Sequence, residues 1–346
     1  VDTTSAAGGG QESADIEEIK FNAPKNFDAQ NRCVTVHDYS SIVKRDYSGA
    51  ESVVSWGGED NDPPIYGKVF IAIKPAAGTT LSGSTKTFIQ DTILGKRNIV
   101  GVTPEIKDPD YLYLGIKSTV KYDSTLTTNS AATLKSTISD TITTYGTNQL
   151  KDFDKAFRYS NLIKQIDESE VSIMSNQTSV SINRYFYPVI ATTAAYDLPF
   201  SNEVYHPANT FWGAVTSGKF SYKDSANTLW ADCRLQDSDG AVQVYRTVGK
   251  ERIVVANNIG TLTYGSGKMA LVDFKPEAIG SSTTGNTASL IVTVTPSSSD
   301  VLPLREQIIL IQSADVDVTM VDDAGTGTYV QGSAATTDGT VISTGY

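Results

Sequence analysis

Residues 8–47 read GGGQESADIEEIKFNAPKNFDAQNRCVTVHDYSSIVKRDY, and this stretch decides how the rest of the chain is organised. The glycines at 8–10 predict a hinge. An acidic, amphipathic pattern predicts a short helix over 13–23, which ends at the following proline. A second helix begins after Thr35, whose side chain forms a capping box with Asp38. Neither helix is long enough to be stable alone, so both must dock on the elements that follow.

Two predicted strands follow, over 51–56 and 67–75, and a turn over 57–64 separates them. The segments GG, ES, AP and NRCVTVHDY, then VVSWGGE and GKVFIAIKP, occur in this order. This order resembles the baseplate J-like proteins of contractile phage tails. The whole chain resembles the C-terminal half of the baseplate wedge proteins of T-even (contractile-tailed) bacteriophages. The motifs are most specific over residues 8–75, and in that family they are positions of the fold rather than catalytic positions.

The resemblance implies a structural role in the virion. A wedge component of this family would join wedges into a ring around the central hub of the tail baseplate, and the ring would rearrange when the tail contracts. The implied partners are the chain itself, as a dimer or ring, and other baseplate wedge proteins. The resemblance also implies assembly in the host bacterial cytoplasm and no enzymatic activity or cofactor.

The composition excludes several classes of function. A net charge of −11 and a pI near 4.7 argue against binding nucleic acid through its phosphates and against an anionic membrane surface. No run of 18 apolar residues occurs, so we expect no membrane insertion. Cys33 and Cys233 are too few for a disulfide framework and are expected to be buried free thiols. The chain starts at Val1 without a signal peptide, which suggests an excised fragment.

The pattern of elements predicts an α+β fold in which an N-terminal α+β domain precedes a β-rich, sandwich-like domain. Residues 1–11 form a flexible lead-in, 12–187 the α+β baseplate J-like domain, and 188–323 the β-rich domain. The Gly/Thr-rich C-terminal segment 324–346 either packs on a partner or stays mobile.

Periodicity predicts the elements within these domains. Helices are expected over 82–94, 130–145 and 158–166, with Gly146 ending the second of them. Strands of the first domain are expected over 99–102, 111–122, 171–174 and 179–186. In the second domain, hairpins are expected around 236–240 and 265–268, and further strands over 289–295, 307–311 and 315–321.

Several groups of residues resemble parts of known ligand sites. Cys33, His37, His206 and Cys233 could supply four zinc ligands, but only the first two are close in sequence, and simple structural roles are favoured. The sequence GSGK at 265–268 lacks the spacing and following helix of a phosphate loop, so a hairpin turn is favoured. The acidic residues at 59–62 miss the calcium-loop template and read as a turn.

Asp315 and Asp317 share one face of a predicted strand. Paired carboxylates can act as acid and base, but a solvated strand face is the favoured reading because no partner is visible. No catalytic, cofactor or metal residues are therefore assigned.

Aromatic residues of the β region give the one candidate interface. Tyr205, Phe211 and Trp212 lie in a loop over 199–212 that is rich in Asn, Pro and aromatics. Core packing is the default role, but Tyr and Trp are also enriched at protein interfaces. The alternatives to a baseplate role are a host-surface-binding β module of a tail or adhesin and, as the weakest option, an envelope hydrolase.

Overall fold

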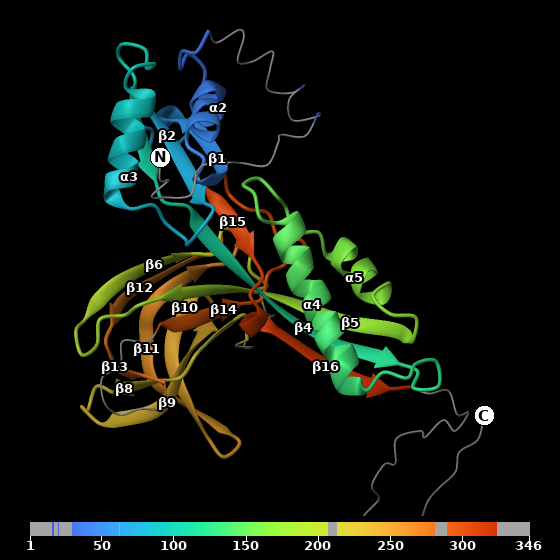
Figure 1. Ribbon diagram of the computed structural model, residues 1–346. Coiled ribbons are helices and arrows are strands. Elements are labelled where there is room, and N and C mark those ends of the chain that lie inside the picture. The colour runs from blue at the N-terminus through green and yellow to red at the C-terminus, as the bar shows by residue number, and fades with distance from the viewer. Residues whose placement is uncertain are drawn as a thin grey trace, which may run out of the picture.

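The computed structural model describes residues 30–61, 63–206, 213–280 and 289–323, together with Ile16 and Lys20 (Figure 1). The predicted lead-in 1–11 and the segment 324–346 lie outside the described residues. The helix predicted over 13–23 also lies outside them, except that Ile16 and Lys20 are helical. The described part contains three sheets, of three, six and seven strands.

The first unit is the three-stranded sheet, against which the helix over 36–46 and the continuous helical segment over 83–94 pack. Its strands, in the order β1-β2-β3, are β1 (Ala50–Gly57), β2 (Lys68–Pro75) and β3 (Thr103–Lys107), and its helical elements are α2 (Val36–Asp46), η1 (Gly58–Asp60), α3 (Gly83–Phe88) and η2 (Ile89–Leu94). The predicted capping box is present: Asp38 Oδ2 accepts a hydrogen bond from the Thr35 N–H at 2.7 Å. Tyr39, Ile42 and Val43 are buried in the core of this unit, as predicted.

Two predictions in this unit are wrong in detail. The strand expected over 99–102 is a turn, in which Gly101 has φ 92°, and pairing with β2 starts only at Thr103. Val100 is therefore fully exposed rather than part of a sheet. The helix over 82–94 is present, but its second half is a π-helix, and Phe88 at the junction is half exposed. A π-helical turn contains more residues than an α-helical turn, so it rotates the positions of the side chains that follow. A prediction from the regular α-helical period does not include this rotation.

The second unit is the six-stranded sheet with two helices on one face. Its strands are β4 (Asp110–Tyr122), β5 (Ile173–Phe186), β7 (Val215–Ser217), β14 (Leu290–Val294), β15 (Gln307–Leu310) and β16 (Val316–Asp322). The order is β15-β4-β5-β14-β7, and β16 pairs with β4 beyond β15. The helices are α4 (Ala131–Gln149) and α5 (Tyr159–Asp167), and the short turn η3 (Ser313–Asp315) separates β15 from β16.

Gly146 does not end α4, which continues to Gln149. A Cβ atom at Gly146 would lie 3.0 Å from Cβ of Ile311, so the glycine permits the helix to approach the sheet closely. The strands expected over 171–174 and 179–186 are one continuous strand, β5, and Val171 lies before it, exposed. Continuous pairing with β4 keeps the polar residues between the two predicted strands in extended conformation.

The third unit is the seven-stranded sheet. Its strands are β6 (Ala194–Pro199), β8 (Phe220–Lys223), β9 (Leu229–Ser238), β10 (Ala241–Val248), β11 (Glu251–Thr263), β12 (Lys268–Phe274) and β13 (Pro276–Ile279), in the order β13-β8-β9-β10-β11-β12-β6. Both predicted hairpins are confirmed. The first turns at Asp239 and Gly240, which both have positive φ, and the second turns through 264–267.

The chain leaves the six-stranded sheet after Phe186, forms β6 of the seven-stranded sheet, and then adds β7 to the six-stranded sheet. It next builds the remaining strands of the seven-stranded sheet and returns at β14, which pairs with β5 and β7. The division expected at residue 188 therefore does not coincide with a boundary between sheets. The two sheets share one hydrophobic cluster. Where they meet, Phe186, Tyr196 and Phe274 pack ring against ring with centroids 5.1–6.3 Å apart. The fold is α+β with a β-rich part.

Candidate functional site

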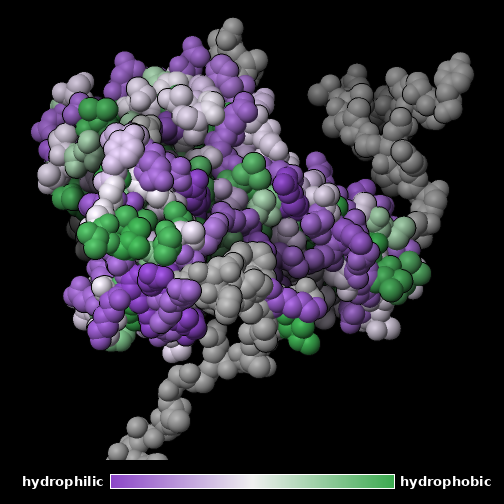
Figure 2. Space-filling model, turned by 90° about the horizontal axis from the view of Figure 1, so that it is seen from above, coloured by the Kyte–Doolittle hydropathy of each residue, from purple (hydrophilic) through white to green (hydrophobic). Residues whose placement is uncertain are grey.

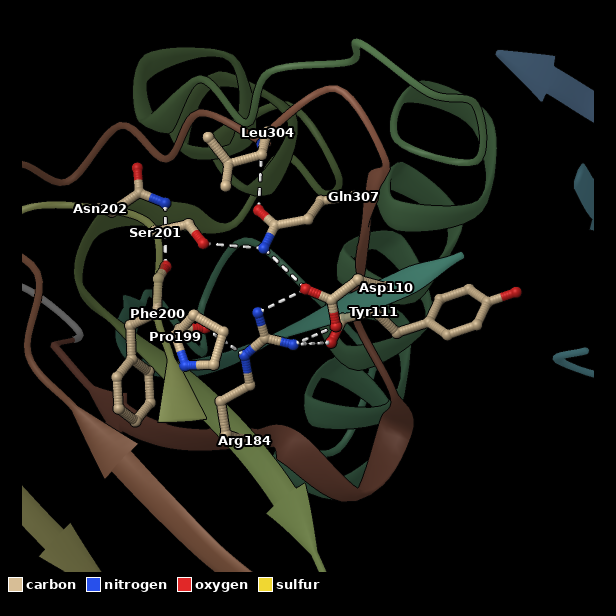
Figure 3. A network of polar contacts seen from close by, with 9 residues as sticks. All are labelled: Asp110, Tyr111, Arg184, Pro199, Phe200, Ser201, Asn202, Leu304 and Gln307. Atoms are coloured by element: carbon tan, nitrogen blue, oxygen red, sulfur yellow. Dashed lines mark hydrogen bonds and ion pairs between the residues drawn. The ribbon is translucent and has the colours of Figure 1, made fainter. Parts of the chain in front are cut away.

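A group of polar side chains, of which Arg184 and Gln307 are buried, joins the six-stranded sheet to the end of β6 (Figure 3). Arg184 on β5 is only 7% exposed, and its guanidinium makes two parallel hydrogen bonds to the Asp110 carboxylate at the start of β4. Arg184 Nε also donates to the Pro199 carbonyl at 2.7 Å, and Nη1 donates to the Tyr111 carbonyl at 3.0 Å. One side chain thus ties the end of β6 to β4 and β5.

Gln307, at the start of β15, extends this group of contacts. Its Nε2 donates to Asp110 Oδ2 at 2.7 Å and to Ser201 Oγ at 2.8 Å. Its Oε1 accepts from the Leu304 N–H at 3.0 Å. Asn202 completes the group, because its side chain accepts from the Leu302 N–H and donates to the Leu302 carbonyl. We call Asp110, Arg184, Ser201, Asn202 and Gln307 the polar junction.

The geometry of the polar junction suits it to holding strands in place. The Asp110 carboxylate accepts hydrogen bonds from both Arg184 and Gln307, and the Arg184 guanidinium bonds to the Pro199 and Tyr111 carbonyls as well. Bidentate arginine–carboxylate pairs are directional, so they fix orientation as well as distance. The junction therefore holds the end of β6 in a fixed position against β4 and β5.

A second set of contacts packs the first unit against the six-stranded sheet. Its apolar part consists of Trp56, Phe70, Ala72, Phe153 and Ile308, which form a small cluster of their own. Around this cluster, the ammonium of Lys107 lies 4.1 Å from the centre of the Phe70 ring, and Arg305 pairs with Asp60. We call this set the seam. The covalent connection across it is short, from Lys107 at the end of β3 to Asp110 at the start of β4.

The predicted interface residues are only partly described. Tyr205 is 51% exposed, whereas Phe211 and Trp212 lie outside the described residues. The described residues on either side of 207–212 are held by hydrogen bonds. Before this segment, the Val204 N–H donates to the Tyr264 carbonyl at 2.8 Å.

After the loop, the Asp237 carboxylate holds the chain. Asp237 is fully buried, and its Oδ1 accepts from the N–H groups of Val215 at 2.9 Å and Gly213 at 3.3 Å. Its Oδ2 accepts from the Tyr264 hydroxyl at 2.9 Å. Burial, reinforced by the Asp237 charge, raises the pKa of Tyr264 to about 12, so the hydroxyl remains a donor at neutral pH.

The four candidate zinc ligands, Cys33, His37, His206 and Cys233, do not form one metal site in the structure. Cys33 and Cys233 are buried free thiols in two separate hydrophobic clusters, as predicted. Burial raises the pKa of both thiols to about 11, which disfavours the thiolate that metal binding needs. His37 is exposed on α2, and His206 lies against Tyr264 with ring centroids 4.2 Å apart. Within the described ranges, no three His, Cys, Asp or Glu side chains are grouped to hold a metal ion.

The acidic pair at 315 and 317 differs from its predicted setting. Asp315 is not on a solvated strand face but in η3, half buried, where its Oδ1 accepts from the Tyr185 hydroxyl at 2.7 Å and from Asn183 Nδ2 at 2.9 Å. Asp317 is exposed on β16. Within the turn predicted over 59–62, Asp60 is the last residue of η1. Its carboxylate forms an ion pair with Arg305.

Sequence reasoning missed the polar junction. Its members are far apart in the chain: Arg184 is 74 residues from Asp110, and Gln307 is 197 residues from it. An arginine within the strand predicted over 179–186 was the one available signal, because a buried charge needs a partner. The partner itself is set by the strand order, which a single sequence does not reveal.

Comparison with known proteins matches two parts of the chain. The family model for baseplate structural protein gp6, C-terminal domain I, matches residues 35–107, and that for C-terminal domain III matches residues 110–185. These ranges agree with the first unit and with the β4–β5 part of the second. The chain is also 25% identical over 231 residues to baseplate wedge protein gp6 of Enterobacteria phage T4.

The aligned part covers 67% of this chain and 33% of that relative, so the chain spans about a third of the relative's length. These matches confirm the resemblance to the baseplate wedge proteins and support a baseplate structural role in a phage tail. None of the helices among the described residues is long and apolar enough to cross a membrane.

Proposed function

We propose that the chain is a structural component of a contractile-tail baseplate wedge, which joins wedges into a ring around the central hub. The observation that carries the proposal is the agreement between the two gp6 domain matches and the structural units, with the match boundary at the Lys107–Asp110 connection. Proposed partners are further copies of the chain and other wedge proteins, and the proposed location is the virion, after assembly in the host cytoplasm.

Exposed hydrophobic side chains of the first unit support a role in assembly. Five large hydrophobic side chains there are 38–104% exposed: Val34, Ile65, Tyr66, Ile99 and Val100. Backbone contacts place them together, since the Cys33 N–H donates to the Arg97 carbonyl and the Thr103 N–H donates to the Gly67 carbonyl. Figure 2, which views the molecule from the side of this unit, shows hydrophobic groups that interrupt the hydrophilic surface. Exposed apolar groups of this kind mark protein contacts.

The contrast between the polar junction and the seam supports a rearrangement on tail contraction. The two larger sheets share a core and the polar junction, so we expect them to move as one body. The first unit is joined to them by the short connection and by the seam, which consists of a five-residue apolar cluster, the Arg305–Asp60 pair and a few hydrogen bonds. Small interfaces of this kind permit rotation without unfolding.

Loss of the chain tests the function directly. In a phage whose gene for this chain carries a nonsense codon, electron microscopy should show tails or tail precursors without complete baseplates. Supplying the full chain in trans should restore complete baseplates. Normal baseplates without the chain, combined with loss of attachment to cells, would instead favour the host-surface-binding module.

The candidate interface around Tyr205 has its own test. Tyr205→Ala should weaken association of the chain with itself or with other wedge proteins in a pull-down from infected cells. Trp212→Ala is expected to act in the same direction. The matched control is Tyr187→Ala, which removes a tyrosine that is 73% exposed elsewhere on the surface. Equal recovery of partners with all three variants would refute this interface.

A further inference from the structure

Arg246, on β10, is a half-buried arginine without an anionic partner. Its Nε atom is buried and donates to no acceptor, and its Nη groups have no acceptor among the described residues either. The guanidinium carbon lies 5.1 Å from the centre of the Trp230 ring, so the side chain rests against an aromatic ring rather than a carboxylate. A guanidinium that loses water without gaining an acceptor lowers the free energy of unfolding.

Other arginines with limited exposure are paired. The side chains of Arg97 and Arg184 are 24% and 9% exposed, and they form ion pairs with Asp46 and Asp110. Since no described residue supplies a carboxylate to Arg246, an acceptor from another molecule would complete the same arrangement there.

Exposed apolar side chains border Arg246. It lies opposite Ile253 of β11, and Val248 lies on the same face of the sheet, two residues further along β10. Ile253 is 39% exposed and Val248 is 45% exposed, although both side chains are hydrophobic. We call Trp230, Arg246, Val248 and Ile253 the arginine surface. An ion pair formed against apolar side chains is stronger than one surrounded by water, because the local dielectric constant is lower.

The hairpin of β10 and β11 is positively charged within a negatively charged protein. Residues 241–256 contain three basic residues and one acidic residue, Glu251, which lies opposite Val248 rather than Arg246, whereas the whole chain has a net charge of −11. The first unit lies at the top of Figure 1 and β9 at the bottom left, so the arginine surface is separate from the exposed hydrophobic groups of the first unit. Its charge and apolar border together fit a carboxylate flanked by apolar side chains.

We propose that the arginine surface docks a different protein of the baseplate, which places an aspartate or glutamate carboxylate on the Arg246 guanidinium. The carboxylate accepts hydrogen bonds from the Nη groups, and its apolar neighbours cover Val248 and Ile253. This inference rests on the proposed function, because the partner is taken from the same assembly.

Two other occupants fit the arginine surface less well. A two-fold contact with a second copy would bring this surface against itself, and the basic side chains of the two hairpins would repel each other. A nucleic acid would meet a chain with a net charge of −11, which repels its phosphates. A carboxylate on a different protein meets neither obstacle.

Photo-cross-linking in assembled particles tests the partner. The full chain is made in infected cells with p-benzoylphenylalanine in place of Ile253, and purified tails are irradiated. Mass spectrometry should find the cross-link in another tail protein, within a segment that contains an aspartate or glutamate. Adding Arg246→Met should reduce the yield at least tenfold. The matched control, Arg158→Met, removes an exposed arginine that is already paired and should leave the yield unchanged.

Urea unfolding of the full chain separates docking from a role in the fold. Because Arg246 has no anionic partner among the described residues, Arg246→Met should unfold at the same urea concentration as wild type or at a higher one. A lower midpoint for this variant would show that Arg246 supports the fold and would overturn the proposal.

The cross-linking result can also overturn the proposal in three ways. These are a cross-link to a second copy or to nucleic acid, a yield that Arg246→Met leaves unchanged, and no cross-link in tails that contain the chain. Complete baseplates that lack the chain would instead contradict the proposed function, so the two failures are distinguishable.

Discussion

Replacing Arg184 by methionine should destabilise the protein more than any single surface ion-pair variant. The side chain of Arg184 is 9% exposed, and its partner Asp110 is 37% exposed. Removing one partner of a fully buried pair costs about 3–5 kcal/mol, because the other charge is left unpaired. Since water can reach part of Asp110, the expected loss for Arg184→Met is smaller, about 2–3 kcal/mol of the free energy of unfolding.

The assay is urea unfolding followed by tryptophan fluorescence, with the variant compared with wild type in the same buffer. The matched control is Arg158→Met, whose pair with Asp300 has side-chain exposures of 53% and 39%. An exposed pair contributes about 0–1 kcal/mol, so the control should unfold close to wild type. Adding Asp110→Leu to Arg184→Met should recover part of the loss, because no unpaired charge then remains.

The reasoning would be refuted if Arg184→Met and Arg158→Met unfolded at the same urea concentration. It would also be refuted if Asp110→Leu and Arg184→Met were strictly additive. Either outcome would mean that the polar junction does not act as a coupled unit and that the shared hydrophobic core alone holds the end of β6 against β4 and β5.

Three further variants follow from particular contacts. Gly146→Leu should lower the free energy of unfolding by about 1–3 kcal/mol in the same assay, because its side chain would collide with Ile311. Asp237→Ala should cost about 2–3 kcal/mol, since it leaves the N–H groups of Val215 and Gly213 and the Tyr264 hydroxyl without this acceptor, and unchanged stability would contradict a role for Asp237 in holding the chain after residue 212. Burial raises the pKa of Cys33 and Cys233 from 9.0 to about 11, so their stabilising contribution is complete below pH 9 and is lost as the pH rises towards 11. Thermal melts from pH 8 to 11 should therefore show a smaller decline for the double alanine variant than for wild type.

Local patterns predicted the helices and strands well where the residues that carry the signal have one usual structural role, such as capping a helix or forming a tight turn. The capping pair Thr35 and Asp38 placed the start of α2, and the glycine-containing turns at 239–240 and 265–268 placed the two hairpins of the seven-stranded sheet. These signals act over a few residues, so the sequence carries them completely.

Predictions failed where a distant contact decided the outcome. Gly146 looks like a helix stop, but its role is to let α4 approach Ile311, which is 165 residues further along. Asp315 looks like part of a solvated strand, but hydrogen bonds from Asn183 and Tyr185 hold it in a turn. The return of β14 to β5 also depends on long-range pairing, so the division expected at residue 188 does not separate the sheets.

Cryo-electron microscopy of the intact phage tail is the most direct test of a baseplate role. The account predicts that the three sheets fit density in the baseplate, repeated around the hub. It further predicts that, between extended and contracted tails, the first unit turns about the Lys107–Asp110 connection while the two larger sheets keep their angle. Density for this chain in a fibre tip or in the sheath, with none around the hub, would contradict it.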